Sequence, residues 1–340
     1  MQRILVIFTG GTIGSQFTGD TINVVAGQTY RLLRDFESRV SASVAFDVIE
    51  PINILSEDAR PEDWAAIANA VIHEVRPEHA GVVVTHGTDT LAYSAAALAL
   101  ALGLHHVEIP VVLVSSDLPL DDPSANGLSN FADAVQVISA LDGPGVFVTY
   151  RNPDGRRLVH LGCRTLPISS LDHYLYSVCH AHIGEFNADG TLNLSLPEPI
   201  PPSSMAVDRN RPVVFSTDVT LLRPYPGLNY DRIDLAGSRA VVHALYHSGT
   251  ASTVDDVSHN IIKFGARCRD AGIPLFATPV PPGIGHYESS VAFPDAGITP
   301  IARMPVDVAY VKTSLGVGLG LDGSELVKFV GQQEIANEFV

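Results

Sequence analysis

Lysine is scarce in this sequence: only three of the 21 basic residues are lysines, and none lies before Lys263. A nucleotide-binding P-loop needs a lysine directly after its glycines, so this kind of phosphate site is excluded from the preceding chain. The basic residues are outnumbered by 37 acidic ones, and the net charge of −16 opposes binding to nucleic acid or to an anionic membrane surface. We therefore expect neither partner and interpret the charge as a source of solubility.

Cysteine and long hydrophobic runs are also rare. Cys163, Cys179 and Cys268 form no C-x-x-C pair and cannot all pair within one chain, which is typical of a reducing compartment and predicts a cytoplasmic protein. The apolar run at residues 4–8 is too short for a signal-peptide core, and the run at 91–104 is shorter than the ~18 residues that indicate a membrane span. Apolar residues nevertheless make up 46% of the chain, enough for a sizeable core.

A repeated alternation of apolar runs organises the first half of the chain. Strand-like runs at 4–8, 44–50, 81–84, 111–114 and 145–150 alternate with helix-like runs at 30–36, 61–75, 91–104 and 129–140. This pattern predicts an α/β fold, a doubly wound and mostly parallel sheet with helices on both faces. Residues 158–183 match no clear pattern.

A composition change marks a second domain, as a length of 340 residues also suggests. Five prolines lie between Pro197 and Pro212, which predicts a linker at 194–212 between an N-terminal catalytic domain at 1–193 and a smaller C-terminal α/β domain at 213–340. In the smaller domain we expect strands at 213–216, 240–246, 274–277 and 299–301, and helices at 254–271 and 307–315.

Polar residues follow the predicted strands where ligands bind in open α/β sheets. Residues 85–90 (Thr-His-Gly-Thr-Asp-Thr) stand between the strand at 81–84 and the helix at 91–104, and residues 9–14 (Thr-Gly-Gly-Thr-Ile-Gly) follow the first strand. The glycine spacing at 10–14 does not fit a dinucleotide motif. His243 and His247 lie four apart without an H-E-x-x-H motif, so we expect no metal and no cofactor and interpret them as buried or surface histidines.

A hydroxyl nucleophile remains as the candidate chemistry. A threonine in a glycine-flanked turn can present its oxygen to a carbonyl while neighbouring N–H groups stabilise the oxyanion. Thr88 and Asp89 add a second hydroxyl and a carboxylate at a helix start, where the dipole favours a negative charge. The alternative is that these two residues only cap the helix.

These motifs resemble a known family. Residues 9–14 look like the first signature of the bacterial L-asparaginase family, which comprises asparaginase/glutaminase-like amidohydrolases, and residues 85–90 look like the second. Between them Ser56-Glu57-Asp58 resembles the family's Ser-x-Asp segment, and residues 124–130 resemble the segment after the fourth strand. The similarity covers residues 1–150 well and the rest more loosely, chiefly through residues 248–250.

The resemblance implies hydrolysis of a side-chain amide to a carboxylate and ammonia, through a threonine acyl-enzyme and without a cofactor. Carried over by position, Thr12 would be the nucleophile and Thr88 the second essential hydroxyl. The substrate's α-carboxylate and α-amino groups would be held by Ser56, Glu57 and Asp89, and Gly11 and Gly87 belong to the same predicted substrate site.

Family members assemble each site at a subunit contact. We therefore expect a homodimer or homotetramer, in which Thr250 or Glu288 of a neighbouring subunit contributes to the site. Residues 15–28, polar and irregular, are either a loop that closes over the site or an ordinary surface connection.

Two departures from the family pattern stand out. The loop at 18–25 lacks the family's tyrosine, with Tyr30 lying further on, and no lysine follows the Asp154-Gly155-Arg156 turn. Arg164 is the nearest equivalent by position; its guanidinium cannot release a proton, although its charge can lower the pKa of a neighbour. His160 can accept a proton near neutral pH. The alternatives are an ordinary strand residue for His160 and a surface ion-pair partner for Arg164.

The sequence thus predicts an amidohydrolase that converts L-asparagine to L-aspartate and ammonia. Its small-molecule substrate would be an amino-acid amide. The alternatives are an amidase for a different amide, which would explain the missing lysine and tyrosine, and a catalytically weak homologue that binds an amino acid.

Overall fold

The fold was analysed in a computed structural model, which describes residues 1–11, 13, 15–18, 21–24, 29–39, 44–141, 143–197, 207–208, 210–255, 257–281 and 287–340. Contacts within the chain divide it into two compact units, Met1–Pro212 and Val213–Val340. Most of the predicted linker lies outside the described residues. Among the described residues, no helix has both the length and the apolar character needed to cross a bilayer.

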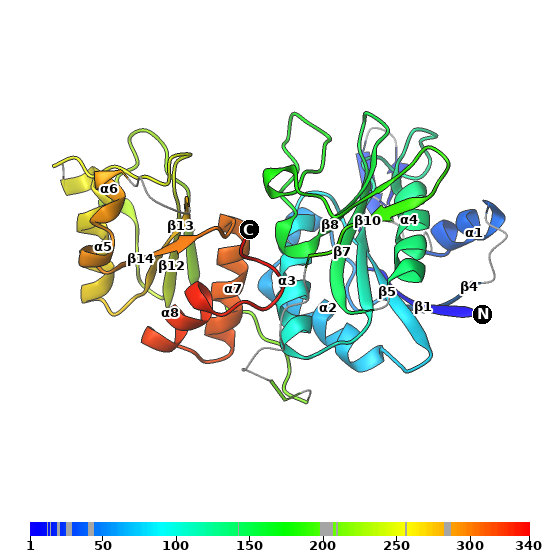
Figure 1. The fold of residues 1–340 in the computed structure, drawn as a ribbon, viewed down its shortest axis with the longest axis horizontal. Helices are drawn as coiled ribbons and strands as arrows, with labels where there is room; N and C mark the ends of the chain where they lie inside the picture. Colours follow the sequence, from blue (N-terminus) through cyan, green and yellow to red (C-terminus); the bar gives the residue numbers. More distant parts are fainter. Residues whose placement is uncertain are drawn as a thin grey trace. The chain divides into compact units, whose positions relative to one another are not determined.

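A large sheet forms the centre of the first unit (Figure 1). Its strands are, in chain order, β1 (Gln2–Ile7), β4 (Val44–Ile49), β5 (His79–Thr85), β6 (Pro110–Val114), β7 (Gly145–Arg151), β8 (Arg157–Leu161), β9 (Gly184–Phe186) and β10 (Leu192–Leu194). In space they follow the order β10-β9-β8-β7-β6-β5-β1-β4. The five strands β4, β1, β5, β6 and β7, neighbours in this order, are parallel, which confirms the predicted α/β class.

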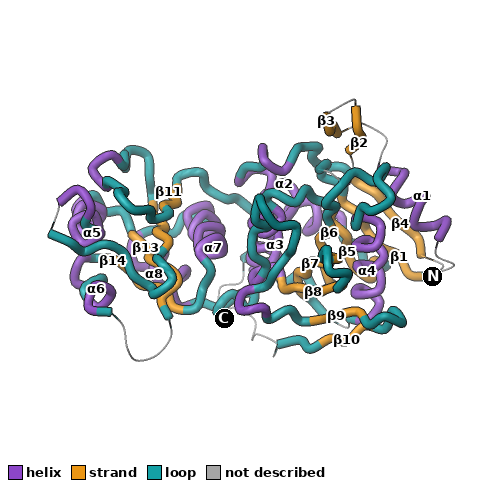
Figure 2. The backbone as a smooth tube through the Cα atoms, turned by 90° about the horizontal axis from the view of Figure 1, so that it is seen from above, coloured by secondary structure: helices purple, strands orange, loops and turns teal. Residues whose placement is uncertain are grey.

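Helices cover both faces of this sheet, as Figure 2 shows. They are α1 (Thr29–Arg39), α2 (Pro61–Glu74), α3 (Leu91–Leu104) and α4 (Gly127–Ala140). Phe36 of α1 packs edge-on against Phe131 of α4 at a centroid distance of 5.2 Å, whereas Trp64 of α2 stacks on Tyr93 of α3 at 6.4 Å. The helices therefore pair as α1 with α4 and α2 with α3, one pair on each face.

Three strands extend the sheet in a way that the sequence pattern did not predict. β8, β9 and β10 run antiparallel to their neighbours and fill the region after β7. β9 and β10 have three residues each, too few for a visible period of two. After β1, β2 (Ser15–Thr18) and β3 (Thr21–Val24) pair as antiparallel strands, so the expectation of an irregular segment was wrong for these residues.

The second unit contains a smaller parallel sheet with the order β11-β12-β13-β14. Its strands are β11 (Val219–Leu222), β12 (Ala240–Ala244), β13 (Leu275–Val280) and β14 (Ile298–Ala302), and its helices are α5 (Ile261–Asp270), α6 (Glu288–Val291), α7 (Val306–Gly318) and α8 (Gly323–Gln332). The smaller α/β unit is therefore confirmed.

Two predicted elements of this unit were wrong in detail. Residues 213–216 join no sheet, because Ser216 exchanges hydrogen bonds with Ser314 of α7 instead. Its N–H donates to the Ser314 carbonyl at 3.0 Å, and its carbonyl accepts from the Ser314 hydroxyl at 2.7 Å. The helix expected at 254–271 begins at Ile261, because the Asn260 side chain accepts the N–H groups of Ile262 and Lys263 and caps it there.

Candidate functional site

The carboxyl ends of β1 and β5 are bonded to each other directly after the two strands. The Thr9 hydroxyl donates to the Thr85 carbonyl at 2.6 Å, and the Thr9 N–H donates to the Thr85 hydroxyl oxygen at 3.4 Å. Both threonines are buried. The polar segments that follow β1 and β5 are therefore bonded to each other where they leave the sheet.

The glycine turn after β1 is held by a third segment. Gly11 donates its N–H to the Ile54 carbonyl at 3.0 Å, and Ile54 donates its own N–H to the Thr9 carbonyl at 3.0 Å. Gly10 and Gly11 have φ angles of +94° and +77°, a left-handed conformation that glycine adopts without strain. A Cβ at Gly11 would lie 2.5 Å from the backbone nitrogen of Gly87. The absence of a side chain thus lets the two turns touch.

Ser56 connects this contact to the start of α3. Its hydroxyl donates to the Asp89 carboxylate at 3.3 Å and accepts the Asp89 N–H at 3.3 Å, while its carbonyl accepts the Thr90 hydroxyl at 2.8 Å. A Cβ at Gly87 would lie 2.4 Å from the Ser56 hydroxyl oxygen. The structure therefore brings Gly11, Ser56, Gly87 and Asp89 together.

The residues of this cluster differ in their exposure to solvent. Ser56 is buried, Thr88 is half-buried, and Asp89 and Glu57 are exposed. Asp89 thus offers its charge to solvent while its carboxylate is held by Ser56. Glu57 lies in the same short 3-10 turn as Ser56 (η2, Ser56–Asp58), with no described bond that directs its side chain to the site.

The interpretation of Thr88 and Asp89 as helix caps finds no support in the bonds at the start of α3. The N-cap residue is Thr90, and its side chain makes no capping hydrogen bond. Thr90 and Asp89 use their side chains on Ser56 instead. The predicted nucleophile, Thr12, lies outside the described residues; its assignment stays a prediction.

His86 is a site residue that the sequence reasoning did not single out within its motif. Its ring is buried, with Nδ1 2.8 Å from the Gly87 carbonyl oxygen and Nε2 2.8 Å from the Ser94 hydroxyl oxygen. Burial lowers the pKa of this imidazole below its ordinary value, against smaller opposing effects of the Gly87 carbonyl and two acidic side chains. The ring is therefore neutral at neutral pH.

Two asparagines fix the neighbouring strand ends. The side chain of Asn126 donates to the Arg151 carbonyl at 2.9 Å and accepts the Asp117 N–H at 2.9 Å. The side chain of Asn130 donates to the Ser115 carbonyl at 2.8 Å and accepts the Arg151 N–H at 2.7 Å. Both are buried, so residues 124–130 hold the ends of β6 and β7 in place.

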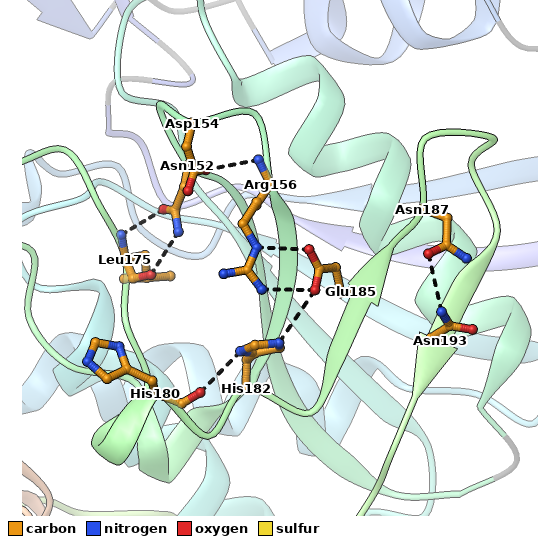
Figure 3. Close-up of polar contacts among 9 residues, drawn as sticks. All are labelled: Asn152, Asp154, Arg156, Leu175, His180, His182, Glu185, Asn187 and Asn193. Carbon is orange, nitrogen blue, oxygen red and sulfur yellow. Dashed lines mark hydrogen bonds and ion pairs between the residues drawn. The ribbon is translucent and has the colours of Figure 1, made fainter.

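The turn after β7 joins β7 to β8 and is shown in Figure 3. The Arg156 guanidinium forms two bonds of 2.9 Å with the Glu185 carboxylate of β9, and the Asn152 side chain bonds the Leu175 backbone. Arg156 therefore secures the antiparallel strands. Its polar contacts in this structure serve the sheet.

Arg164 lies beyond β8 in the 3-10 turn η3 (Gly162–Arg164), which packs against α3. Two observations place this turn beside the second turn of the helix: the Cys163 sulfur lies 4.0 Å from the Ala96 carbonyl oxygen, and a Cβ at Gly162 would lie 2.8 Å from the Ala95 carbonyl oxygen. Arg164 itself is half-buried. The helix that begins after Thr88 and Asp89 is thus the one that Arg164's turn contacts.

His160, the other proposed substitute for the lysine, points into the protein from β8. Its Nδ1 lies 2.8 Å from the Ser177 hydroxyl oxygen and its Nε2 is buried without a hydrogen-bond partner among the described residues. Burial, with a smaller contribution from His182, lowers its pKa to about 3. The ring is a weak base, which argues against the suggestion that it takes up a proton near neutral pH.

The second unit holds the two residues expected to act from a neighbouring subunit. Thr250 follows β12 in a tight turn, in which Tyr246 donates its N–H to the Thr250 carbonyl at 2.9 Å. Glu288 begins α6, and Ser290 of that helix donates its hydroxyl to the Gly249 carbonyl at 2.7 Å. The structure thus places the two segments side by side in one unit.

Metal binding finds no geometric support in the described part of the chain. It contains no group of three or more histidine, cysteine, aspartate or glutamate side chains arranged for an ion. His243 is buried in β12, where its Nε2 lies 3.0 Å from the Tyr230 hydroxyl oxygen. It is therefore a core histidine.

Comparisons with known proteins point to one family. A family model described as "Asparaginase, N-terminal" matches residues 3–196. Two curated relatives are each named as a subunit of glutamyl-tRNA(Gln) amidotransferase. The protein from Saccharolobus solfataricus is 27% identical over 327 residues, with 92% of this chain and 70% of the relative covered. The protein from Thermofilum pendens is 30% identical over 347 residues, with 95% and 72% covered.

Two solved structures share the fold. The thermostable L-asparaginase from Thermococcus kodakarensis superimposes with a TM-score of 0.80 at 23% identity, and L-asparaginase I from Vibrio cholerae with a TM-score of 0.75 at 20% identity. Each comparison covers 100% of this chain and 99% of the other. Since the family match spans more than half of the sequence, and a relative with 30% identity is covered over most of its length, the chain belongs to the asparaginase family.

Proposed function

We propose that this protein hydrolyses the side-chain amide of an amino acid, with L-asparagine as the first candidate substrate, to the corresponding acid and ammonia. The observation that carries the proposal is the convergence of Gly11, Ser56, Gly87 and Asp89 at the ends of β1 and β5. Three separate segments supply these residues, and none of their contacts is needed to complete a strand or a helix. A site for a small polar ligand is the best explanation.

The charges in the site suit an amino acid. The exposed carboxylate of Asp89 would bind the substrate's α-ammonium group, since a charge-assisted hydrogen bond to an ammonium is stronger than one between neutral groups. The Ser56 hydroxyl, turned from Asp89 toward the ligand, and backbone N–H groups would serve the α-carboxylate, and Glu57 would extend the polar rim. The side-chain amide would then lie toward the turn at Gly10 and Gly11, next in sequence to the predicted nucleophile Thr12.

The proposed reaction has two steps. The Thr12 hydroxyl oxygen attacks the amide carbon, the carbon–nitrogen bond breaks, and ammonia leaves with the hydroxyl proton, giving a threonine ester. Water then attacks the ester carbon, the bond between that carbon and the Thr12 oxygen breaks, and a proton from the water restores the Thr12 hydroxyl as the acid leaves. Thr88, the half-buried hydroxyl at the start of α3, would assist the proton transfers. No cofactor enters either step.

We propose that the enzyme acts as a homodimer or homotetramer in the cytoplasm. The segments that carry Thr250 and Glu288 meet in the second unit, so a neighbouring copy would present both to a site at once. The oligomer would thereby complete the rim around the α-ammonium group, where a second acidic side chain favours a cation.

The curated relatives support a second candidate, an amide-cleaving subunit of an amidotransferase complex. This chain corresponds to 70–72% of the length of relatives that are named as a subunit. Its net charge of −16 argues against direct contact with tRNA, so in such a complex another subunit would bind the nucleic acid. The reaction at the threonine would be the same, with glutamine as a further substrate.

The test is ammonia release from L-asparagine and L-glutamine by the purified protein. Thr12→Ala should abolish release, and Thr88→Ala should lower kcat by roughly 100-fold or more, as loss of a group that moves protons does. Thr191→Ala, which removes an exposed hydroxyl from a turn between β9 and β10, serves as the matched control and should leave kcat unchanged.

The preferred amide decides between the candidates. Turnover of asparagine supports an asparaginase, and turnover of glutamine alone supports the amidotransferase subunit. Ammonia release that is equal in wild type and Thr12→Ala would refute the threonine mechanism. Calorimetric binding of asparagine or aspartate without turnover would instead favour an amino-acid-binding homologue.

A further inference from the structure

The imidazole of His86 lies between two partners that fix its proton. The Gly87 carbonyl can only accept, so the Nδ1 atom 2.8 Å away must donate and must carry the proton. Burial favours the neutral ring, so Nε2 is left as an acceptor, and the Ser94 hydroxyl at 2.8 Å donates to it. Only one tautomer satisfies both contacts.

The Gly87 carbonyl belongs to the peptide that leads into Thr88, and this peptide is trans. In a planar trans peptide the C=O and the following N–H point in opposite directions. Because the carbonyl is directed at the buried His86 ring, the Thr88 N–H is directed away from that ring.

The other sides of Gly87 are occupied by the site itself. A Cβ on Gly87 would lie 2.4 Å from the Ser56 hydroxyl oxygen and 3.5 Å from the Gly11 Cα. Gly87 thus has substrate-site residues on one side and a histidine hydrogen bond at its carbonyl. Glycine has the widest backbone freedom of all residues, so a bond at this carbonyl decides how the next peptide is turned.

We propose that His86 is a positioning residue that sets the orientation of the Gly87–Thr88 peptide and thereby aims the Thr88 N–H and hydroxyl at the reacting group. The proposal rests on the amidase function proposed above. Ser94, one turn into α3, completes the arrangement by holding the ring from the helix side. An aimed backbone N–H is the kind of donor that stabilises a developing oxyanion.

Two isosteric substitutions separate the two ring nitrogens. In His86→Asn the amide nitrogen can take the place of Nδ1 and keep the bond to Gly87, whereas in His86→Gln it can reach only the place of Nε2. His86→Asn should therefore keep kcat within about threefold, while His86→Gln should lower kcat roughly ten- to 100-fold, as a misplaced catalytic group does, with KM nearly unchanged. A merely structural histidine would give equal losses in both variants, and that result overturns the proposal.

A measurement without turnover tests the same point. In protein labelled with 15N-threonine, the Thr88 amide resonance should move in His86→Gln and stay in place in His86→Asn. Ser94→Ala, a small change inside a helix, should move it by an intermediate amount and keeps the test available should both His86 variants unfold. A Thr88 resonance that ignores Ser94→Ala, or that moves equally in the two His86 variants, overturns the positioning role.

The two proposals fail in different ways. A wild-type protein that releases no ammonia, with the Thr88 resonance responding as expected, refutes the amidase and leaves the role of His86 standing. An active wild type whose two His86 variants behave alike refutes the positioning role of His86 and leaves the amidase proposal standing.

Discussion

The contact between the two glycine turns makes a specific prediction about Gly11. An alanine there would place its Cβ 2.5 Å from the Gly87 nitrogen and 2.7 Å from the Gly87 Cα, and these are backbone atoms that cannot rotate away. The left-handed φ of +77° costs an alanine about 1–2 kcal/mol, and overpacking adds about 1–3 kcal/mol. We expect Gly11→Ala to lower the free energy of unfolding by about 2–5 kcal/mol.

Gly155 offers a matched control, because it separates the two contributions. Its φ of +86° is nearly the same, but nothing lies within 4 Å of a Cβ placed on it. Gly155→Ala should therefore lose only the conformational part, about 1–2 kcal/mol, and should keep ammonia release while Gly11→Ala loses it. Trp64, the single tryptophan, is buried in the first unit, so its fluorescence during urea unfolding reports on this unit. Equal shifts of the two urea midpoints would refute the close approach of the turns.

Three further predictions concern charges. Asp89→Asn should raise KM for an amino-acid substrate roughly tenfold or more while changing kcat less, because it removes the anion for the ammonium group; steady-state ammonia release checks this, and an unchanged KM would contradict it. Lys312→Met should lower the free energy of unfolding of the second unit by about 3–5 kcal/mol, because it leaves the buried Glu338 carboxylate without the ammonium group 2.7 Å away. Urea unfolding monitored by circular dichroism measures this loss, and the double variant with Glu338→Leu should recover part of it. Burial lowers the pKa of His243 to about 4, so between pH 6.5 and 4 the unfolded chain binds a proton that the native chain does not. The free energy of unfolding should therefore decrease as the pH is lowered through this range, by at most about 1.4 kcal/mol per pH unit. Urea unfolding at several pH values measures this slope, and His243→Gln should reduce it.

Long, strongly patterned elements could be predicted from the sequence, since their own residues determine them. The alanine- and leucine-rich run at 91–104 predicted the bounds of α3, because nearly every side chain of that helix is buried and no charged residue interrupts it. The β-branched runs of β5 and β6 likewise predicted two strands of a mostly parallel sheet, and in the structure these strands pair in parallel. The strands β8 to β10 escaped prediction because their partners, and not their composition, keep them in the sheet.

The site was predictable as far as its residues lie in contiguous motifs. Residues 85–90 stand where the strand-to-helix pattern placed them. The bond between Ser56 and Asp89 joins residues 33 positions apart, so no local pattern contains it. The role of His86 depends on Ser94, which lies in a run typical of a plain helix, and no pattern in the chain connects the two residues.

The proposed site has no counterpart of the lysine that the family pattern places after residues 154–156. The Arg164 guanidinium has no lone pair with which to accept a proton, and His160, with a pKa of about 3, does not hold a proton at neutral pH. Neither side chain supplies a group that exchanges a proton near pH 7 beside Thr88. Cleaving an amide requires a proton for the departing nitrogen. We therefore expect this protein to bind the amino acid through Ser56 and Asp89 and to release ammonia slowly, at a rate limited by protonation of the departing nitrogen.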